Sequence, residues 1–244
     1  MTAGTAWEPT ETGEATPTAS RHPGRGEPVR DVQGRRIIVM RHGVTEYNLA
    51  NIVQGQLDIP LSPEGEAQAA LAAPFVARMR PDLVISSDLR RASYTAFQVA
   101  AQLQLDVVLD PRLRESASGT WEGMPVDQLD PVPDWTTFGV TSPRGGPEGE
   151  SVIDVVERVR PLLDEVRETL PEGGCALLVT HGVTARALTA ELVGLDQGVA
   201  WVALAGLHNC GWGVIEEGHR GWRLRSWNLT APEQADLGLS ADSG

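Results

Sequence analysis

Two histidines stand in nearly the same local setting although they are far apart in the chain. The stretch IIVMRHGVT, residues 37–45, contains His42, and the stretch LLVTHGVT, residues 177–184, contains His181. Each histidine follows an apolar run and is itself followed by glycine, valine and threonine. One histidine after a strand can be a purely structural residue, whereas two in matched positions indicate a shared site.

Arginines accompany these histidines and indicate which ligand the site would bind. Arg41 directly precedes His42, and the stretch SSDLRRASYTA places Arg90 and Arg91 at a junction between a strand and a helix. Guanidinium groups disfavour a metal cation, and the histidine spacing matches neither H-E-x-x-H nor a Cys/His cluster. Arginines at strand ends and helix starts instead suit a phosphate. The sequence therefore predicts an anion pocket without a metal ion.

A histidine in a phosphate pocket permits attack on phosphorus by a neutral ring nitrogen. The leaving alkoxide would then need a proton. The stretch RLRESASGTWEG supplies a candidate acid in Glu115, which lies ahead of a loop rich in glycine and serine. Taken alone, Glu115 is better interpreted as a solvated loop glutamate, so its role needs further support.

The elements that would position these residues alternate along the chain. Strands are expected over residues 35–40, 81–87, 106–110 and 175–180, and helices over residues 62–80, 88–104 and 184–194 and from Ser151 onward. A final hairpin is expected from NCGWGVIEE and GWRLRSW. This order predicts an α/β fold, a three-layer sandwich whose mainly parallel sheet is flanked by helices. Ligands of such sheets bind beyond the carboxyl ends of the strands, where both histidines would lie.

Single residues predict where the helices begin and where one of them is interrupted. Ser62 is expected to be an N-cap residue, with Pro63 in the first helical position. Asp88 is expected to cap the next helix. Pro161 is expected to kink or divide the helix that begins near Ser151.

Charge and composition limit the partners. The formal net charge of −13 makes nucleic acid and anionic lipid poor partners. No apolar run approaches the roughly 20 residues that cross a bilayer, and no secretory signal is recognisable, so a cytoplasmic location and no membrane are expected. Cys175 and Cys210, both in apolar runs, are expected to be buried free thiols.

Five motifs make the chain resemble the histidine phosphatase superfamily, also called the phosphoglycerate mutase-like family. They are RHGVTEYN, the pair Gln54–Gly55, SSDLRRASYTA, LRESASGTWEG and VTHGVTARAL, and they occur in the order seen in that family. A lone Arg-His-Gly is a weak signal, but five motifs in order are a strong one. The resemblance runs from about residue 36 to about residue 194 and implies a phosphoglycerate mutase-like fold that reaches the last hairpin.

The resemblance also implies a role for each matched residue. His42 would be the nucleophile that becomes phosphohistidine, and Glu115 would donate a proton and then act as the base towards water. The groups that would hold the phosphoryl oxygens are Arg41, Asn48, Arg91, His181 and the backbone N–H of Gly182. Gln54 and Gly55 would border the pocket entrance. The resemblance implies no metal and no organic cofactor, in agreement with the argument from the arginines.

The family contains both phosphatases and mutases, and the residues after Glu115 favour a phosphatase. Mutases typically continue with ERHYG and an insertion rich in arginine and lysine, whereas this chain continues with SASGTWEG and has one basic residue, Arg144, in residues 122–150. A cofactor-dependent phosphoglycerate mutase and a non-catalytic module that binds phosphorylated ligands remain the alternatives. A pure binding module would not need Glu115. A phosphatase acting on phosphoproteins is also left open.

Within the phosphatases, GQLDIPLS, GTWEG and WRLRSWN are most similar to actinobacterial enzymes, among them glucosyl-3-phosphoglycerate phosphatases. The expected partner is therefore a small phosphorylated metabolite, with glucosyl-3-phosphoglycerate as the first choice. Ribazole phosphate, sugar phosphates and 3-phosphoglycerate stay open as substrates, because fold and motif do not fix the substrate. The sequence leaves a homo-oligomer possible.

The domain boundaries follow from composition. Residues 1–34, rich in Thr, Pro, Gly, Glu and Ala, are expected to form a disordered tail, and residues 231–244 a flexible one. Residues 35–230 would be the catalytic domain, with a cap insertion at about 122–150. Trp135 and Phe138 in the cap are candidate pocket walls, whereas tryptophans outside it, including Trp201, are expected to serve in packing.

Overall fold

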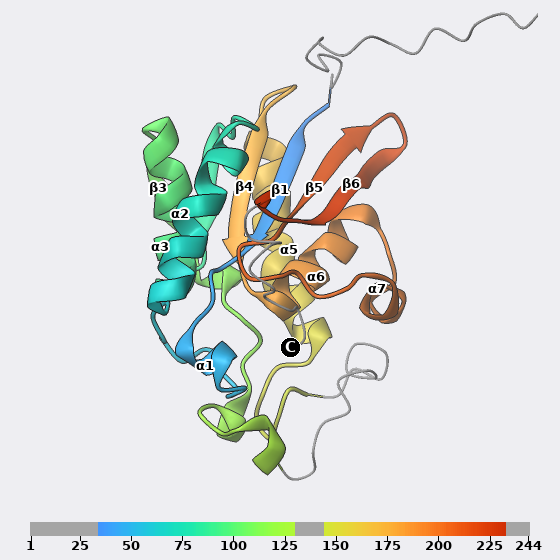
Figure 1. Ribbon diagram of the computed structural model, residues 1–244. Coiled ribbons are helices and arrows are strands. Elements are labelled where there is room, and N and C mark those ends of the chain that lie inside the picture. Colours follow the sequence, from blue (N-terminus) through green and yellow to red (C-terminus); the bar gives the residue numbers. More distant parts are fainter. Residues whose placement is uncertain (1–33, 130–143, 233–244) are drawn as a thin grey trace, which may run out of the picture. The chain divides into compact units, whose positions relative to one another are not determined.

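The computed structural model describes residues 34–129 and 144–232. Within them the strands form one sheet (Figure 1), in the spatial order β3 (Val107–Leu109), β2 (Leu83–Ser86), β4 (Cys175–Thr180), β1 (Arg36–Arg41), β5 (Trp212–Gly218) and β6 (Gly221–Leu229). The pairs from β3 to β1 are parallel, and β5 and β6 form the antiparallel hairpin beside β1. The predicted mainly parallel sheet with a final hairpin at one side is confirmed.

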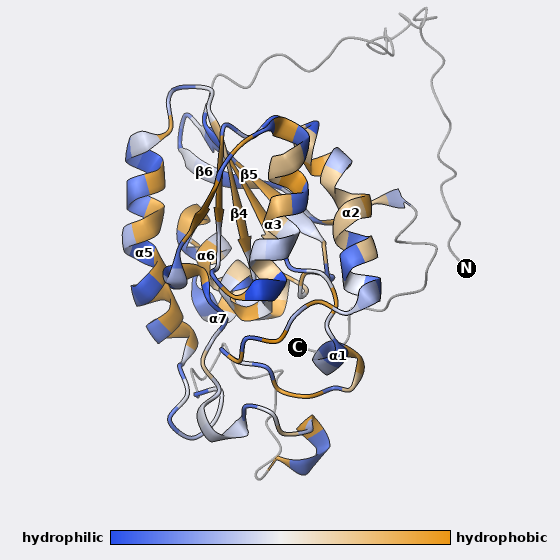
Figure 2. Cartoon of the chain, turned by 90° about the vertical axis from the view of Figure 1, so that its left-hand side faces the viewer, coloured by the Kyte–Doolittle hydropathy of each residue, from blue (hydrophilic) through white to orange (hydrophobic). Residues whose placement is uncertain are grey.

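Helices cover both faces of this sheet. They are α1 (Glu46–Leu49), α2 (Pro63–Ala77), α3 (Arg90–Leu103), α5 (Val152–Thr169), α6 (Gly182–Val193) and α7 (Gln197–Ala203). Figure 2 shows the apolar strands between one layer that contains α2 and α3 and another that contains α5 and α6. Side chains alternate between the faces along a strand, so Ile38 and Met40 pack with α2 and α3, whereas Ile37 and Val39 pack with α5 and α6. The three-layer α/β sandwich is confirmed.

The pairing of β1 with β4 brings the two matched histidines together. Arg41 lies opposite Thr180 in the parallel register, so His42 and His181 follow their strands at the same level. The backbone N–H of His42 continues the pairing by donating to the carbonyl of Thr180 at 3.0 Å. Both strands are almost completely buried, as expected for central parallel strands covered on two sides.

The predictions for the start of α2 and for the two cysteines are confirmed. Ser62 is the N-cap of α2 and accepts from the Gly65 N–H at 3.1 Å, and Pro63 opens the helix. Gly194 ends α6 in the left-handed conformation, with φ of 68°. Cys175 and Cys210 are buried and free. No helix in the described residues is both long and apolar enough to cross a lipid bilayer.

The predicted cap of α3 is wrong. The N-cap residue is Leu89, which makes no side-chain cap hydrogen bond. Asp88 instead forms an ion pair with Arg114 at 2.6 Å, and the first helical N–H, that of Arg90, donates to Asp58 at 2.7 Å. The same Asp58 carboxylate pairs with the Arg90 guanidinium, so this arginine lies outside the pocket. A residue distant in sequence therefore satisfies the donor that the local pattern assigned to Asp88.

Pro161 does not divide the helix in which it lies. α5 is one helix of 18 residues from Val152 to Thr169. Proline in a helix interior costs about 3 kcal/mol, whereas each fully buried aliphatic side chain contributes roughly 1.5–3 kcal/mol. Val159, Leu162 and Leu163 are all buried on the core side of α5. This apolar face offsets the lost hydrogen bond.

The predicted cap insertion is only partly covered by the structure. Residues 130–143, with Trp135 and Phe138, lie outside the described residues, so the predicted boundaries of the cap and the two pocket walls stay predictions. Directly before the predicted cap, Trp121 packs with Val53 and Leu129 in a small cluster of its own. This agrees with the packing role expected of tryptophans outside the cap.

Candidate active site

A cavity of about 750 Å³ opens where β1 and β4 end. Of the residues predicted for the site, those that line it are Arg41, His42, Asn48, Gln54, Gly55, Arg91, Glu115 and Gly182. His181 is fully buried beside the cavity, with its ring centroid 5.0 Å from that of His42. The fold thus brings the predicted residues to one place, although they come from four separate parts of the sequence.

His42 is held as a neutral imidazole with one ring nitrogen left to react. Its Nδ1 lies 2.6 Å from the carbonyl oxygen of Gly43, which can only accept, so Nδ1 carries the proton and Nε2 keeps its lone pair. Burial lowers the pKa of His42 well below its usual range, and the charges of Arg91 and Arg41 lower it further. A neutral imidazole with a free Nε2 is the form that can attack phosphorus.

His181 is positioned by a different partner. Its Nε2 lies 2.9 Å from the hydroxyl of Ser87, the residue directly after β2, and its Nδ1 is buried with no hydrogen-bond partner among the described residues. Burial, followed by the charge of Arg91, lowers its pKa well below the usual value. The two histidines therefore differ in their contacts: one is fixed by its own backbone and the other by a neighbouring strand.

The pocket is positive although the chain is strongly acidic. Arg91 is 1% exposed and donates to the carbonyls of Leu57 at 2.6 Å and Gly55 at 2.8 Å, whereas Arg41 donates to the carbonyl of Leu207 at 2.7 Å. Both Nε atoms are buried without a partner in the described residues. Burial lowers the pKa of Arg91 to about 10, so the group is still charged at neutral pH. Two fixed cations with unused donors suit a phosphate.

Glu115 is anchored at the start of α6. Its Oε1 accepts from the N–H groups of Ser116 at 2.9 Å and Thr184 at 3.2 Å, and its Oε2 accepts from that of Val183 at 3.2 Å. A carboxylate is favoured at a helix N-terminus. Gly182, the first residue of α6, lies beside this carboxyl group, since a Cβ placed on it would lie 3.7 Å from Oε2. The interpretation of Glu115 as a solvated loop residue is therefore wrong.

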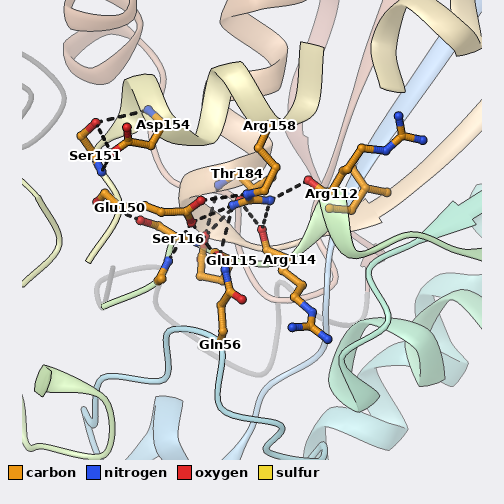
Figure 3. A network of polar contacts seen from close by, with 12 residues as sticks. Gln56, Arg112, Arg114, Glu115, Ser116, Glu150, Ser151, Asp154, Arg158 and Thr184 are labelled. Atoms are coloured by element: carbon orange, nitrogen blue, oxygen red, sulfur yellow. Dashed lines mark hydrogen bonds and ion pairs between the residues drawn. The ribbon is translucent and has the colours of Figure 1, made fainter. Parts of the chain in front are cut away.

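A network that includes Arg158 supports the backbone before and at Glu115 (Figure 3). The Arg158 guanidinium, which projects from α5, donates to the carbonyls of Arg112 at 2.6 Å and Arg114 at 3.1 Å. Two further bonds of 2.9 Å join it to the carboxylate of Glu150. Neither Arg158 nor Glu150 was singled out from the sequence, because neither follows a strand. Both act by positioning the segment that carries Glu115.

Asn48 reaches the cavity from the short helix α1. Thr45 caps this helix, and the Asn48 Oδ1 accepts from the N–H of Thr45 at 3.1 Å and from its hydroxyl at 3.0 Å. Because these bonds use the carbonyl oxygen of the side chain, the Nδ2 amino group remains to donate to a ligand. The Thr45 hydroxyl also lies 2.9 Å from the Gln54 Oε1, which links the predicted entrance residue to the same cap.

Gly55 is required by its backbone conformation and by its surroundings. Its φ of 48° lies in the left-handed region, and a Cβ at this position would meet the Glu122 Oε1 at 2.1 Å. Glu122 is fixed there because it accepts from the N–H groups of Gln56 and Ser118. The same turn presents the Gly55 carbonyl to Arg91. A glycine is therefore needed to hold Arg91 in the pocket wall.

Arg186 and Trp201 also line the cavity, and neither was expected there. The Arg186 guanidinium carbon lies 4.0 Å from the centroid of the Trp201 ring. Trp201 is 8% exposed, as expected for a residue that serves in packing, but it also lines the cavity. The sequence feature that could have indicated Arg186 as a pocket residue is its position four residues after Gly182, on the same face of α6.

The two buried histidines predict a loss of stability in mild acid. In the unfolded chain a histidine has a pKa of about 6.5, whereas burial lowers the pKa of both residues in the folded state. The unfolded state thus binds more protons below about pH 6.5. The free energy of unfolding should therefore decrease as pH falls from 7 to 5.5, by up to about 1.4 kcal/mol per pH unit for each histidine. Urea unfolding in phosphate-free buffer measures this dependence.

Single substitutions test which groups carry this pH dependence. His42→Asn and His181→Asn should each flatten the slope by about half, since each removes one of two protons. His219→Gln, at an exposed position in the β5–β6 turn, is the matched control and should keep the original slope. Unchanged slopes in both active-site variants would contradict the assignment.

In the described residues, no group of three or more His, Cys, Asp or Glu side chains is arranged to hold a metal ion. The model of the histidine phosphatase superfamily (branch 1) matches residues 37–230. A glucosyl-3-phosphoglycerate phosphatase of Mycobacterium tuberculosis is 37% identical over 227 residues, which cover 84% of this chain and 100% of that protein. A probable phosphoglycerate mutase of Yersinia enterocolitica is 35% identical, with 84% of this chain and 96% of that protein covered.

Solved structures agree with these relatives. A mycobacterial glucosyl-3-phosphoglycerate phosphatase in complex with VO3 aligns with a TM-score of 0.73 and 38% identity, over 80% of this chain and 100% of that one. A phosphoserine phosphatase from Entamoeba histolytica in complex with 3-phosphoglyceric acid aligns with a TM-score of 0.68 and 28% identity, over 80% and 98%. Family model, relatives and structures lead to one conclusion: this chain belongs to the histidine phosphatase superfamily.

Proposed function

We propose that this protein is a metal-independent phosphatase that hydrolyses a small phosphate monoester through a phosphohistidine at His42. The observation that carries the proposal is the state of the His42 ring. Its proton is fixed on Nδ1 by the Gly43 carbonyl, and Arg41 and Arg91 flank it; in the part of the chain that the structure describes, no hydrogen bond occupies its Nε2 and the Nε donors of both arginines are unused. Phosphoryl transfer to histidine needs this combination of a neutral nucleophile and fixed cations.

Each residue then has a step. The His42 Nε2 attacks phosphorus, so that an N–P bond forms while the ester P–O bond breaks. Arg41, Arg91 and His181 stabilise the charge on the phosphoryl oxygens. Glu115 enters this step in its protonated form and gives its proton to the leaving oxygen; as a carboxylate it then takes a proton from the water that attacks the phosphohistidine. Inorganic phosphate leaves, and both residues return to their starting forms.

The contacts of Arg144, which lies in the predicted cap, favour hydrolysis over mutase activity. Arg144, the single basic residue in residues 122–150, is paired with Asp154 at 3.0 Å and donates to the Gly149 carbonyl at 2.6 Å. A mutase needs additional cations around its substrate to retain the phosphorylated intermediate. Because Arg144 is engaged by its own neighbours, this stretch offers no such cation.

Glucosyl-3-phosphoglycerate is the substrate we propose first. Support comes from the relative in M. tuberculosis, which carries that name and is matched over its full length. The cavity of about 750 Å³ lies within the range of pockets that hold drug-sized molecules, so it is larger than a phosphate alone requires. A cytoplasmic location, where such metabolites occur, is part of the proposal.

Phosphate release from a panel of metabolites, with EDTA present throughout, tests the proposal. The panel contains glucosyl-3-phosphoglycerate, 3-phosphoglycerate, ribazole phosphate and simple sugar phosphates. We expect one clearly preferred substrate and the same rate with and without the chelator. Loss of activity in EDTA that added metal restores would refute metal independence. If no compound released phosphate and the protein interconverted 3- and 2-phosphoglycerate, the protein would be a mutase and not a phosphatase.

A further inference from the structure

A third cation faces the cavity beyond the phosphate-binding arginines. Arg186 lies on α6 four residues after Gly182, so both are on the same face and about 6 Å apart along the helix axis. Neither the catalytic steps nor the motifs assign it a task. Its position is one helical turn from the helix start at which Glu115 is held.

The surroundings of Arg186 hold the side chain in place but give its guanidinium no direct ion pair among the described residues. The guanidinium is stacked on Trp201, and its Nε is buried without a hydrogen-bond partner in the described residues. No carboxylate of the described residues lies within ion-pair distance of it, and the Glu115 carboxylate acts on its charge only from farther away. A Cβ placed on Gly206 would lie 3.3 Å from Nη2, so a glycine there gives the guanidinium room on its pocket side. Removing a cation from water without a direct hydrogen-bonded partner is costly, which indicates that an anionic group of a ligand pairs with Arg186.

A stacked guanidinium is well suited to one class of ligand group. The face of the group is occupied by the indole ring of Trp201, so the edge with its N–H donors remains for hydrogen bonds. An edge-on guanidinium binds a carboxylate through two parallel hydrogen bonds. The separation of about 6 Å from Gly182 along the helix suits a carboxylate that is two carbon atoms away from a phosphate ester oxygen.

We propose that Arg186, supported by Trp201, is the specificity residue that binds a carboxylate of the substrate. The enzyme then selects phosphate monoesters that carry an acid group close to the phosphate, as phosphoglycerates do, over neutral sugar phosphates. This inference rests on the proposed phosphatase function and names the substrate class of the same site. It also assigns the apolar wall around Trp201 to the part of the substrate beyond the phosphate.

A matched pair of substrates tests the proposal. 3-Phosphoglycerate and glycerol 3-phosphate differ only in that the first has a carboxylate where the second has a hydroxymethyl group. Wild-type kcat/KM should be higher for 3-phosphoglycerate. Arg186→Met should reduce the ratio of the two values by about 10- to 100-fold, the scale of a hydrogen bond to a charged group. Arg186→Lys should restore part of the ratio, because it keeps the charge but loses the fork of donors.

A control separates recognition from an effect on folding or net charge. Arg220→Met removes an equal charge from an exposed position in the β5–β6 turn and should leave both kcat/KM values unchanged. If Arg186 only holds α7 against α6, Arg186→Met should lower kcat/KM equally for both substrates and leave the ratio of the two values unchanged. That outcome would overturn the proposal.

Binding measurements keep the inference separate from the proposed function. In a His42→Ala background, which cannot turn the ligands over, calorimetry compares the affinities of the two compounds with and without Arg186→Met. Selective weakening of 3-phosphoglycerate binding supports the carboxylate subsite even if the wild-type protein hydrolyses neither compound. Equal affinities for the two ligands in the presence of Arg186 would refute the subsite, whether or not the protein is a phosphatase.

Discussion

Replacement of His42 by alanine is expected to reduce kcat for every phosphate monoester by at least about 10⁴-fold, because the nucleophile itself is lost. The residues that bind the phosphate remain, so the affinity for inorganic phosphate should change far less than the rate. An acid-labile phosphoenzyme, trapped by rapid quenching with a ³²P-labelled substrate, should be present in the wild type and absent in the variant. Fold integrity is checked by urea unfolding of both proteins.

The matched control for this substitution is His219→Ala, in an exposed turn of the final hairpin. It should keep both the turnover and the phosphoenzyme of the wild type. Substantial turnover by purified His42→Ala, or a phosphoenzyme label that persists in it, would show that another group attacks phosphorus. His181 would then be the residue to test next, since its ring lies beside that of His42.

Glu115→Gln should lower the rate by about 10²–10⁴-fold for a substrate whose leaving alkoxide needs a proton, the usual scale of general acid catalysis. For p-nitrophenyl phosphate, the first-turnover release of nitrophenolate should fall much less, because that leaving group is stable as an anion. The subsequent hydrolysis of the phosphohistidine should slow with either substrate, since the general base is lost. Quenched-flow kinetics of both substrates separate the two steps.

Glutamine has nearly the same shape but replaces one carboxylate oxygen by a donor. The Val183 N–H or the pair of N–H groups from Ser116 and Thr184 then loses an acceptor, so a stability measurement must accompany the kinetics. Glu168→Gln, at an exposed position on α5, controls for the change of charge. If the first step slowed equally for an alkyl phosphate and for p-nitrophenyl phosphate, the role of Glu115 as the acid would have to be abandoned.

The positions of the two histidines could be predicted from the sequence because the relevant pattern is local. A continuous apolar run marks each central strand, and the residue after it must lie at the carboxyl edge of the sheet. That β1 and β4 are neighbours does not follow from either stretch alone. The resemblance to a known family supplied it, and the register between Arg41 and Thr180 agrees.

The supporting contacts could not be predicted, because they join segments that are distant in sequence. Asp58, rather than Asp88, satisfies the first N–H of α3. Arg158 holds the backbone around Arg114 from a helix more than 40 residues later. Arg186 was not singled out from the sequence, and only the packing of α7 against α6 gives it Trp201 as a partner. Motifs fix the reacting groups, whereas tertiary packing fixes their geometry.

The parallel pairing of β1 with β4 has a consequence for protein synthesis. Domains are built from the N-terminus at about 5–20 residues per second, and β1 with His42 is made early. His181 and the start of α6, which holds Glu115, leave the ribosome much later. A growing chain therefore carries the proposed nucleophile, together with Arg41 and Arg91, for many seconds before His181 and the helix start that holds Glu115 are made. On the proposed mechanism phosphoryl transfer has to wait for β4 and α6, so a truncated or unfinished chain is expected to be inactive.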